Sequence, residues 1–307
     1  AVEGYDAQAA EALGRCDLVL SRLKEGISTL RQNEDAMSAF RFANRAMAQQ
    51  RVRSIYARKR RQGEAVTADE LNTAANRTWH PFQLAFLLLS VPALADPSHS
   101  DRTEPLAAYA DLLWFPTGGG KTEAYLGVAA FAMSIRRLQG TLGGVDAGRG
   151  LAVIMRYTLR LLTLQQFQRA STLICAMELL RKQAPDVWGT EPFTLGLWVG
   201  GSVTPNRTED SHDAIEKERD NRRDTGSTPA QLTSCPWCGS AINPGRDITV
   251  EKYPGAARTF IYCSDKYGRC EFSKAQYPEL GLPVVVVDEE IYRRPPTMLI
   301  ATVDKFA

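Results

Sequence analysis

The sequence predicts an α/β fold with a parallel sheet, and three observations lead to this prediction. Short apolar runs that suit buried strands alternate with longer stretches that have helical spacing. A glycine-rich loop separates one such run from a helical stretch, and strand-like runs return near Val284 and Met298. This alternation is typical of parallel sheets whose strands are joined by helical crossovers.

Length and composition set the broad class. The chain has 307 residues, of which 44% are hydrophobic and 23% charged, as in a soluble globular protein with one large domain or two. The net charge of +2 identifies no partner. No apolar signal segment opens the chain, so we expect a cytoplasmic protein. A first residue other than Met and an end directly after a strand-like segment suggest part of a longer protein.

Residues 1–75 are predicted to form a helical N-terminal extension, because apolar side chains recur every three to four positions. Cys16 lies on an apolar stripe that runs from Leu13 to Leu30, and it is therefore expected in the core. Cys175 lies in another apolar helical run and receives the same interpretation.

A basic stretch lies within this extension. From Ala36 to Gly63 there is no acidic residue, and eight residues are basic. Such a stretch suits a phosphate backbone, but it equally suits a solvated helix face, and both interpretations stay open. The basic residues are Arg41, Arg45, Arg51, Arg53, Arg58, Lys59, Arg60 and Arg61.

The longest apolar run, from Leu84 to Ala95, is interrupted by Pro92 and is too short to span a bilayer. A buried helix is the better interpretation, and we expect no membrane contact.

The glycine-rich loop follows Leu112-Leu113-Trp114, a predicted strand, and precedes a predicted helix. This order creates an anion site, because backbone N–H groups converge there and the helix dipole favours negative charge. Lys121 would reach the β- and γ-phosphates of ATP, and the Thr122 hydroxyl would contact Mg²⁺. Phe115 stands where such loops usually begin with glycine. The predicted contacts to the nucleotide are Thr117, Gly118, Gly119, Gly120, Lys121, Thr122 and Glu123, with Lys121 and Thr122 as the catalytic pair.

Two more strands are predicted downstream. The first is the continuous apolar run 151–155, expected to be buried on both faces, and the second covers 193–201. A helix from about residue 159 to 183 joins them. From Arg207 to Asp224, twelve of eighteen residues are charged, which indicates either an exposed helix or a disordered insertion.

Four cysteines form two pairs, Cys235 with Cys238 and Cys263 with Cys270. A C-x-x-C turn aims two thiolates at one tetrahedral metal, and four sulfur ligands favour structural Zn²⁺. The second pair, with six residues between its cysteines, is looser than usual. A redox motif would normally open a helix in a thioredoxin-like unit, which is not seen here. We therefore predict a zinc site that stabilises a small domain.

The order of these segments resembles superfamily 2 helicases and translocases, whose motor begins with a RecA-like domain. Gln83, after Trp79 and Phe82, resembles the glutamine that reads adenine in that family. The segment from Arg156 to Gln165 resembles motif Ia, and Pro296 to Phe306 resembles motif Ib, both of which contact the DNA backbone. The resemblance thus implies nucleic-acid contacts at Arg156, Thr158, Arg160, Gln165 and Thr302.

More specifically, the loop 115–126, the run 155–169, the cysteine pairs and the final Val-Asp-Lys-Phe-Ala are similar to the helicase-like subunit of bacterial DISARM anti-phage systems. This resemblance spans most of residues 35–307. It implies ATP-dependent action on DNA, together with other subunits, in defence against phage.

With the resemblance, the expected organisation is a helical extension at 1–75, a RecA-like P-loop core at 76–205, a charged linker and zinc-binding insertion at 206–282, and a return to the core at 283–307. Asp288-Glu289 follows four valines and is either the Walker B box or the solvent end of a returning strand. Motif Ib normally precedes that box but follows it here. We therefore expect the hydrolytic carboxylates beyond Ala307, and nucleotide binding without turnover by these 307 residues alone.

Two other functions remain open from the sequence. One is a DNA-independent P-loop enzyme such as a kinase, which would not need the basic stretch, the motif Ia segment or the zinc site. The other is a non-catalytic subunit that binds DNA and uses ATP only to lock an assembly.

Overall fold

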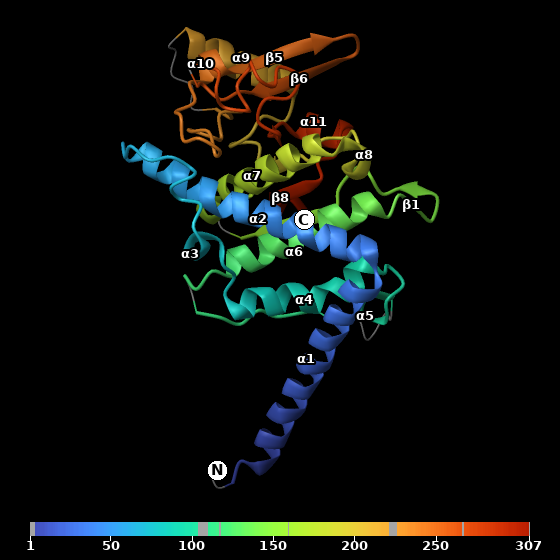
Figure 1. The fold of residues 1–307 in the computed structure, drawn as a ribbon. Coiled ribbons are helices and arrows are strands. Elements are labelled where there is room, and N and C mark those ends of the chain that lie inside the picture. The colour runs from blue at the N-terminus through green and yellow to red at the C-terminus, as the bar shows by residue number, and fades with distance from the viewer. Residues whose placement is uncertain are drawn as a thin grey trace.

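A four-stranded parallel sheet lies at the centre of the protein, covered by long helices on one side (Figure 1). The computed structural model describes residues 4–103, 110–116, 118–158, 160–220, 226–265 and 267–306, and it describes only the backbone of 160–162 and 304. Thr117, a predicted nucleotide contact, and the side chain of Arg160, a predicted nucleic-acid contact, lie outside the described residues.

The sheet has the strand order β3-β8-β4-β7, and every neighbouring pair is parallel. Tyr157 on β3 lies opposite Thr302 on β8, and Leu197 on β4 lies opposite Ile300. The predicted α/β class with a parallel sheet is confirmed. The strands are β3 (Val153–Tyr157), β4 (Leu195–Trp198), β7 (Val284–Val285) and β8 (Met298–Thr302).

The two faces of the sheet are covered differently. The helices α6 (Lys121–Leu138) and α7 (Arg160–Gln183) lie against one face, where Met298 and Ile300 join the main hydrophobic core. On the other face Leu299 packs with Ile291 of the short helix α11 (Asp288–Arg293). The 3-10 turn η1 (Val303–Phe306) follows β8.

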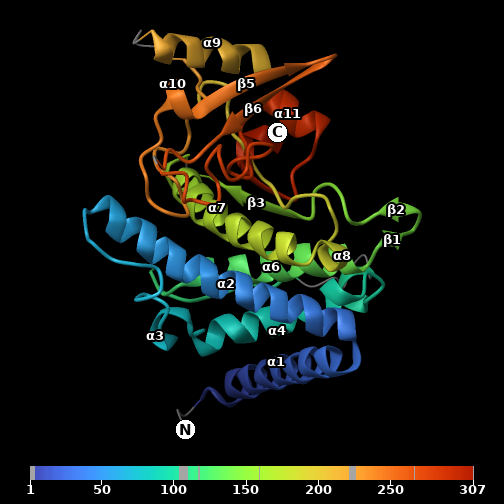
Figure 2. The same ribbon diagram turned by 45° about the horizontal axis from the view of Figure 1, so that its top comes forward.

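Three further helices lie outside α6 and α7: α1 (Asp6–Gln32), α2 (Glu34–Arg61) and α4 (Pro81–Ala95). Figures 1 and 2 show α1 on the outer side of α4, away from the sheet. The predicted helical extension divides at Asn33, whose side chain accepts a hydrogen bond from the Ala36 N–H at 2.9 Å and so caps α2. Gly26 allows the close approach of α1 to α4, since a Cβ there would lie 2.2 Å from the Leu88 carbonyl oxygen.

The helix α4 forms where the apolar run predicts it, with Leu87 and Val91 buried and Pro92 inside it. Residues 74–95 are the one stretch of the described chain that is long and apolar enough to qualify as a membrane span. Core helices of soluble proteins meet the same criterion, and α4 packs between α1 and α6.

The prediction for Cys16 is wrong, whereas that for Cys175 is confirmed. Cys175 is completely buried, but Cys16 is exposed, as are Leu13 and Leu20 on the same stripe. The spacing correctly places these side chains on one helix face. The first half of α1 extends past α4, so within the described chain no element covers that face.

The predicted strand Leu112-Leu113-Trp114 is also wrong. Residues 110–116 form no strand, and Leu112 and Trp114 are 86% and 88% exposed. The segment is held elsewhere, because both carboxylate oxygens of Asp111 accept hydrogen bonds from Arg22 of α1, at 2.6 and 2.9 Å. The strand that should precede the glycine-rich loop in a RecA-like sheet is therefore absent from the described sheet.

The strand β3 is less buried than the sequence predicts, since only part of it is covered. It lies at one edge of the sheet and pairs only with β8 among the described strands, so Ile154 and Arg156 are exposed. A strand with a neighbour on one side cannot be buried as fully as a central strand.

Shorter elements connect these parts. The glycine-rich segment 140–150 contains a small antiparallel hairpin. The short elements are α3 (Ala74–Arg77), α5 (Ser100–Thr103), β1 (Thr141–Leu142), β2 (Val145–Asp146), α8 (Pro185–Trp188) and α10 (Pro244–Asp247).

The insertion between β4 and β7 packs directly on α7. Its helix α9 (Thr208–Arg219) shows that the highly charged segment is helical up to Arg219, and α9 lies on the antiparallel hairpin of β5 (Ile248–Tyr253) and β6 (Ala256–Ile261). The Tyr277 hydroxyl donates to the buried carboxylate of Glu178 on α7 at 2.8 Å. The insertion therefore shares the main hydrophobic core, to which Cys235, Trp237 and Cys263 belong.

We expect docking of the hairpin to depend on pH through Glu290. This side chain is buried, and its Oε1 accepts a hydrogen bond from the Thr259 N–H at 2.8 Å. Burial raises its pKa from 4.5 to about 7. Because the folded pKa lies above the unfolded one, the stabilisation is complete below about pH 4.5 and is lost as pH rises through 7.

Glu290→Gln cannot ionise and keeps a carbonyl acceptor. Relative to the wild type, it should gain about 2–3 kcal/mol of unfolding free energy between pH 5 and 8. Thermal or urea unfolding at several pH values measures this gain. An equal pH dependence of both proteins would contradict it.

Candidate functional site

The glycine-rich loop turns directly into the N-terminus of α6. Gly118 and Gly120 have φ angles of +82° and +88°, which favour glycine, and Gly120 directly precedes α6. Lys121 is the first residue of α6, and its ammonium group donates to the carbonyl oxygens of Phe115 at 2.5 Å and Pro116 at 3.4 Å. The lysine thus folds over the loop at a helix N-terminus, where negative charge is favoured.

Gln83 lies against this loop although it is 37 positions earlier in the sequence. Its side chain is buried, its Nε2 donates to the Gly120 carbonyl at 2.8 Å, and its Oε1 accepts from the His80 N–H at 2.8 Å. These two partners fix the orientation of the amide. The sequence had placed Gln83 with the loop by resemblance alone, and the structure brings the two together.

An aromatic pair forms one wall beside Gln83. The rings of Phe82 and Phe115 are stacked, with centroids 3.8 Å apart. Trp79 holds this segment against α2 and α6. Its Nε1 donates to the Asn44 side chain of α2 at 2.7 Å, and its ring packs directly over Gly127 of α6. A Cβ on Gly127 would come within 2.8 Å of that ring.

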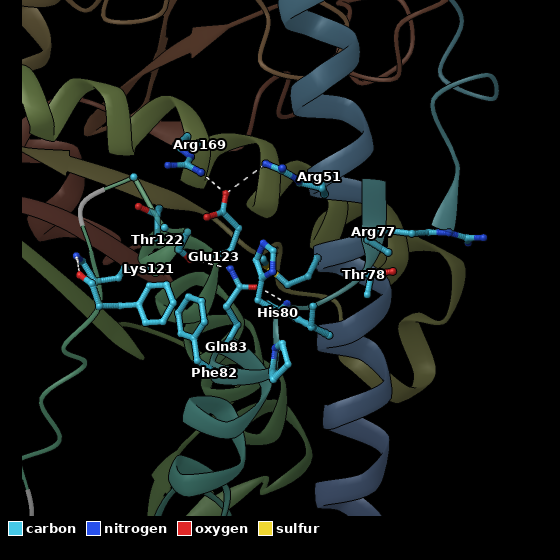
Figure 3. Close-up of a pocket in the computed structure, with 18 of the residues that line it drawn as sticks. Arg51, Arg77, Thr78, His80, Phe82, Gln83, Lys121, Thr122, Glu123 and Arg169 are labelled. Carbon is cyan, nitrogen blue, oxygen red and sulfur yellow. Dashed lines mark hydrogen bonds and ion pairs between the residues drawn. The ribbon is translucent and has the colours of Figure 1, made fainter. Parts of the chain in front are cut away.

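These groups line a cavity of about 1050 Å³, which is large enough for a nucleoside triphosphate (Figure 3). Basic side chains predominate in it, with Arg51, Arg77, Lys121 and Arg169 against the single acid Glu123. Glu123 is already paired, because its Oε1 contacts Arg169 of α7 and lies 3.6 Å from Arg51 of α2. Thr122 lies in the same cavity between Lys121 and Glu123.

Arg51 and Arg169 are the site residues that sequence reasoning did not assign to this cavity. Arg51 was noted only as one member of the basic stretch. No local signal links either arginine to Glu123, because the three residues come from α2, α6 and α7, which meet only in the folded chain.

Three of the predicted nucleic-acid contacts lie at the carboxyl ends of two neighbouring strands. Arg156 and Thr158 are exposed at the end of β3, and Thr302 ends β8 directly beside it. Gln165 is exposed on α7, and the backbone of Arg160 begins that helix. Thr302 is buried, and its Oγ1 has no hydrogen-bond partner among the described residues.

The carboxylates of Asp288 and Glu289 do not line the nucleotide-sized cavity. Asp288 is buried and pairs with Lys305 at 2.6 Å. Glu289 accepts hydrogen bonds from the backbone N–H and hydroxyl of Thr208, and these bonds lower its pKa. The Glu289 carboxylate therefore ties α11 to α9 of the insertion, whereas the Asp288 carboxylate ties α11 to the turn η1. The strand that precedes α11, β7, lies at the opposite edge of the sheet from β3.

The four cysteines of the two pairs converge. Their sulfur atoms all lie within 4.8 Å of one another, with Sγ–Sγ distances of 3.9 Å for Cys235 and Cys270 and 3.3 Å for Cys238 and Cys263. Tetrahedral zinc with Zn–S bonds of about 2.3 Å needs sulfur atoms about 3.8 Å apart, so this cluster fits the ion. Burial raises the pKa of Cys235, whereas hydrogen bonds from neighbouring thiols, first that of Cys235, lower the pKa of Cys238. The looser second pair therefore supplies both of its cysteines to the cluster.

The cysteine cluster is packed tightly on α2. Gly239 has a φ of +82°, as expected after a C-x-x-C turn, and a Cβ there would lie 2.6 Å from the Ala57 carbonyl oxygen. The guanidinium of Arg53 lies 4.4 Å from the centre of the Trp237 ring and 3.5 Å from Glu271. Since Trp237 also donates to Glu271 at 2.9 Å, the basic helix and the cysteine turn form one connected network.

Comparison with known proteins agrees with these motifs. No protein-family model matches the chain. The chain is 38% identical over 302 residues to the DISARM protein DrmA of Bacillus paralicheniformis. The match covers 95% of this chain and 25% of DrmA, so the chain spans about a quarter of that relative's length. The chain is thus a relative of part of the DISARM protein DrmA, which confirms the resemblance predicted from its motifs.

Proposed function

We propose that the chain is the ATP-binding part of a DNA-dependent, helicase-like ATPase that acts in bacterial defence against phage. One observation carries this proposal: the glycine-rich loop, Lys121, Gln83 and the stacked pair Phe82 and Phe115 line a single cavity at the N-terminus of α6. A phosphate site and a candidate base site within one cavity suit a nucleotide.

The loop would hold the phosphates. The first N–H groups of α6 have no partner within the helix and would donate to phosphate oxygens, together with the Lys121 ammonium group. To do so, Lys121 exchanges its contacts with the Phe115 and Pro116 carbonyls for the β- and γ-phosphates. The Thr122 hydroxyl would hold Mg²⁺, which neutralises charge that develops on the phosphates.

Gln83 would select adenine. Each end of its amide makes one hydrogen bond, which leaves a second proton on Nε2 and a second lone pair on Oε1. The free Nε2 proton and the free Oε1 lone pair complement an acceptor and a donor on the edge of adenine. The stacked rings of Phe82 and Phe115 offer an apolar surface beside them.

The carboxyl edge of β3 and β8 would contact the DNA backbone through Arg156, Thr158, Arg160, Gln165 and Thr302. Ligands of open α/β sheets bind at this edge. Hydroxyl and guanidinium groups at strand ends are suited to phosphate oxygens, and such contacts position a strand without reading its sequence.

The role in defence rests on the relative, which is a DISARM protein. We therefore propose that other defence-system subunits are partners of the whole protein. The four-cysteine cluster would hold Zn²⁺ in a closed, structural site. The proposed units are the extension 1–75, a P-loop core at 76–205 and 283–307, and the zinc-binding insertion 206–282.

ATP turnover by the full-length protein, measured with and without DNA, tests the proposal. We expect turnover that DNA stimulates. Turnover that ignores DNA would instead favour a P-loop enzyme of another kind. Nucleotide binding without turnover would favour a non-catalytic assembly subunit.

A further inference from the structure

A second, smaller cavity adjoins the nucleotide-sized one. It measures about 230 Å³ and lies between α2 and α7. We call it the α2–α7 groove, and its main lining residues are Arg51, Arg58 and Arg61 of α2, Arg169 and Thr172 of α7, and Pro236. The two cavities share Arg51, Glu123 and Arg169, so they meet at this cluster of charges.

The groove is strongly basic. Its four arginines face one acid, Glu123, which already pairs with Arg51 and Arg169. Across the part of the chain that the structure describes, no carboxylate lies within ion-pair distance of Arg58 or Arg61, and both are exposed. Two cations without counter-charges therefore face the outer part of the groove.

The arginines of α2 share one helix face, because positions 51, 58 and 61 are separated by seven and three residues. At about 1.5 Å per residue they span about 15 Å along the helix axis. This length suits a few successive phosphates, and a volume of about 230 Å³ suits one strand rather than a duplex.

The cysteine turn forms one side of the groove. The Thr172 hydroxyl donates to the Pro236 carbonyl at 3.2 Å, and the Arg61 guanidinium donates to the Ser234 hydroxyl at 3.3 Å. The proposed zinc site thus has a second consequence, since it fixes one wall of a basic channel whose other walls are helices.

We propose that the α2–α7 groove binds the phosphate backbone of a single nucleic-acid strand. This inference rests on the proposed nucleic-acid-dependent function and adds a contact separate from the sheet edge at Arg156 and Thr302. Phosphates in the groove compete with Glu123 for Arg51 and Arg169, and the same two arginines face the nucleotide cavity. Strand binding and nucleotide binding are therefore coupled at this cluster.

The test compares the full-length double variant Arg58→Gln, Arg61→Gln with the matched control Arg41→Gln, Arg45→Gln. The control residues are exposed on the same helix and line neither cavity. Fluorescence anisotropy with a labelled single-stranded oligonucleotide, over a series of salt concentrations, gives affinity and salt dependence. We expect the groove variant to bind about tenfold more weakly and to lower the log–log salt slope by about 1.4, or 0.7 per lost phosphate contact.

The control should keep both the wild-type affinity and slope. The inference is overturned if the groove variant matches the wild type, if the control loses as much, or if the wild type binds no strand. Binding is measured without ATP, so a loss of strand binding is distinguished from a loss of the proposed ATPase activity. ATP affinity of the groove variant should be unchanged, because neither altered side chain lines the nucleotide cavity.

Discussion

Replacing Lys121 by alanine should reduce DNA-stimulated ATP turnover by the full-length protein about 10²–10³-fold. Lys121 is the one lysine among the described residues that line the cavity. Its ammonium group lies over the loop whose amides would face the phosphates. Without it, charge that develops on the transferred phosphoryl group loses its nearest fixed cation. Phosphate release measured at saturating ATP and DNA checks the effect.

A control separates this role from general loss of charge. Lys24→Ala removes an exposed lysine from α1, away from the cavity, and should leave turnover unchanged. Lys121→Ala should also keep the wild-type melting temperature, because the side chain contacts only loop carbonyls. Wild-type turnover in the Lys121 variant would refute the assignment of this loop as the phosphate site.

Replacing Cys238 by serine should remove bound zinc and lower the free energy of unfolding by about 3 kcal/mol or more. Metal binding by thiolates contributes directly to folding, and zinc-finger peptides gain about 10–16 kcal/mol from the ion. Total stability is only about 5–15 kcal/mol, so the variant should lose much of it. Metal analysis, expected to give one zinc per wild-type chain, and thermal unfolding are the measurements.

Cys16→Ser is the matched control, because Cys16 is exposed and lies outside the cluster. It should change neither zinc content nor stability. If the Cys238 variant kept a full equivalent of zinc, the four-cysteine site would be wrong. If zinc were absent from the wild type, the cluster would have to be explained by packing alone.

Local patterns predicted the parts of this protein that local chemistry determines. The glycine-rich loop, the C-x-x-C turn and the strand that ends at Thr302 all lie where the sequence places them. Each depends on backbone conformation or on ligand spacing within a few residues.

The wrong predictions concern contacts between distant elements. Leu112 to Trp114 has the composition of a strand, but a strand needs a neighbour, and the Arg22–Asp111 pair holds this segment beside α1 instead. The stripe that contains Cys16 has core spacing, yet spacing states which side chains share a face and not whether another element covers it. For the same reason the Arg51–Glu123–Arg169 cluster was not foreseen.

The length of α2 has a mechanical consequence. It is an unbroken helix of 28 residues, about 42 Å long at 1.5 Å per residue, and it crosses both α6 and α7. Its middle faces the nucleotide cavity through Arg51, while its last turns hold the cysteine turn and its first residue follows the joint with α1. Its buried residues run from Ala36 to Ala57, so α2 is held along most of its length. It therefore joins the α1 joint, the nucleotide-sized cavity and the cysteine turn through one rigid element.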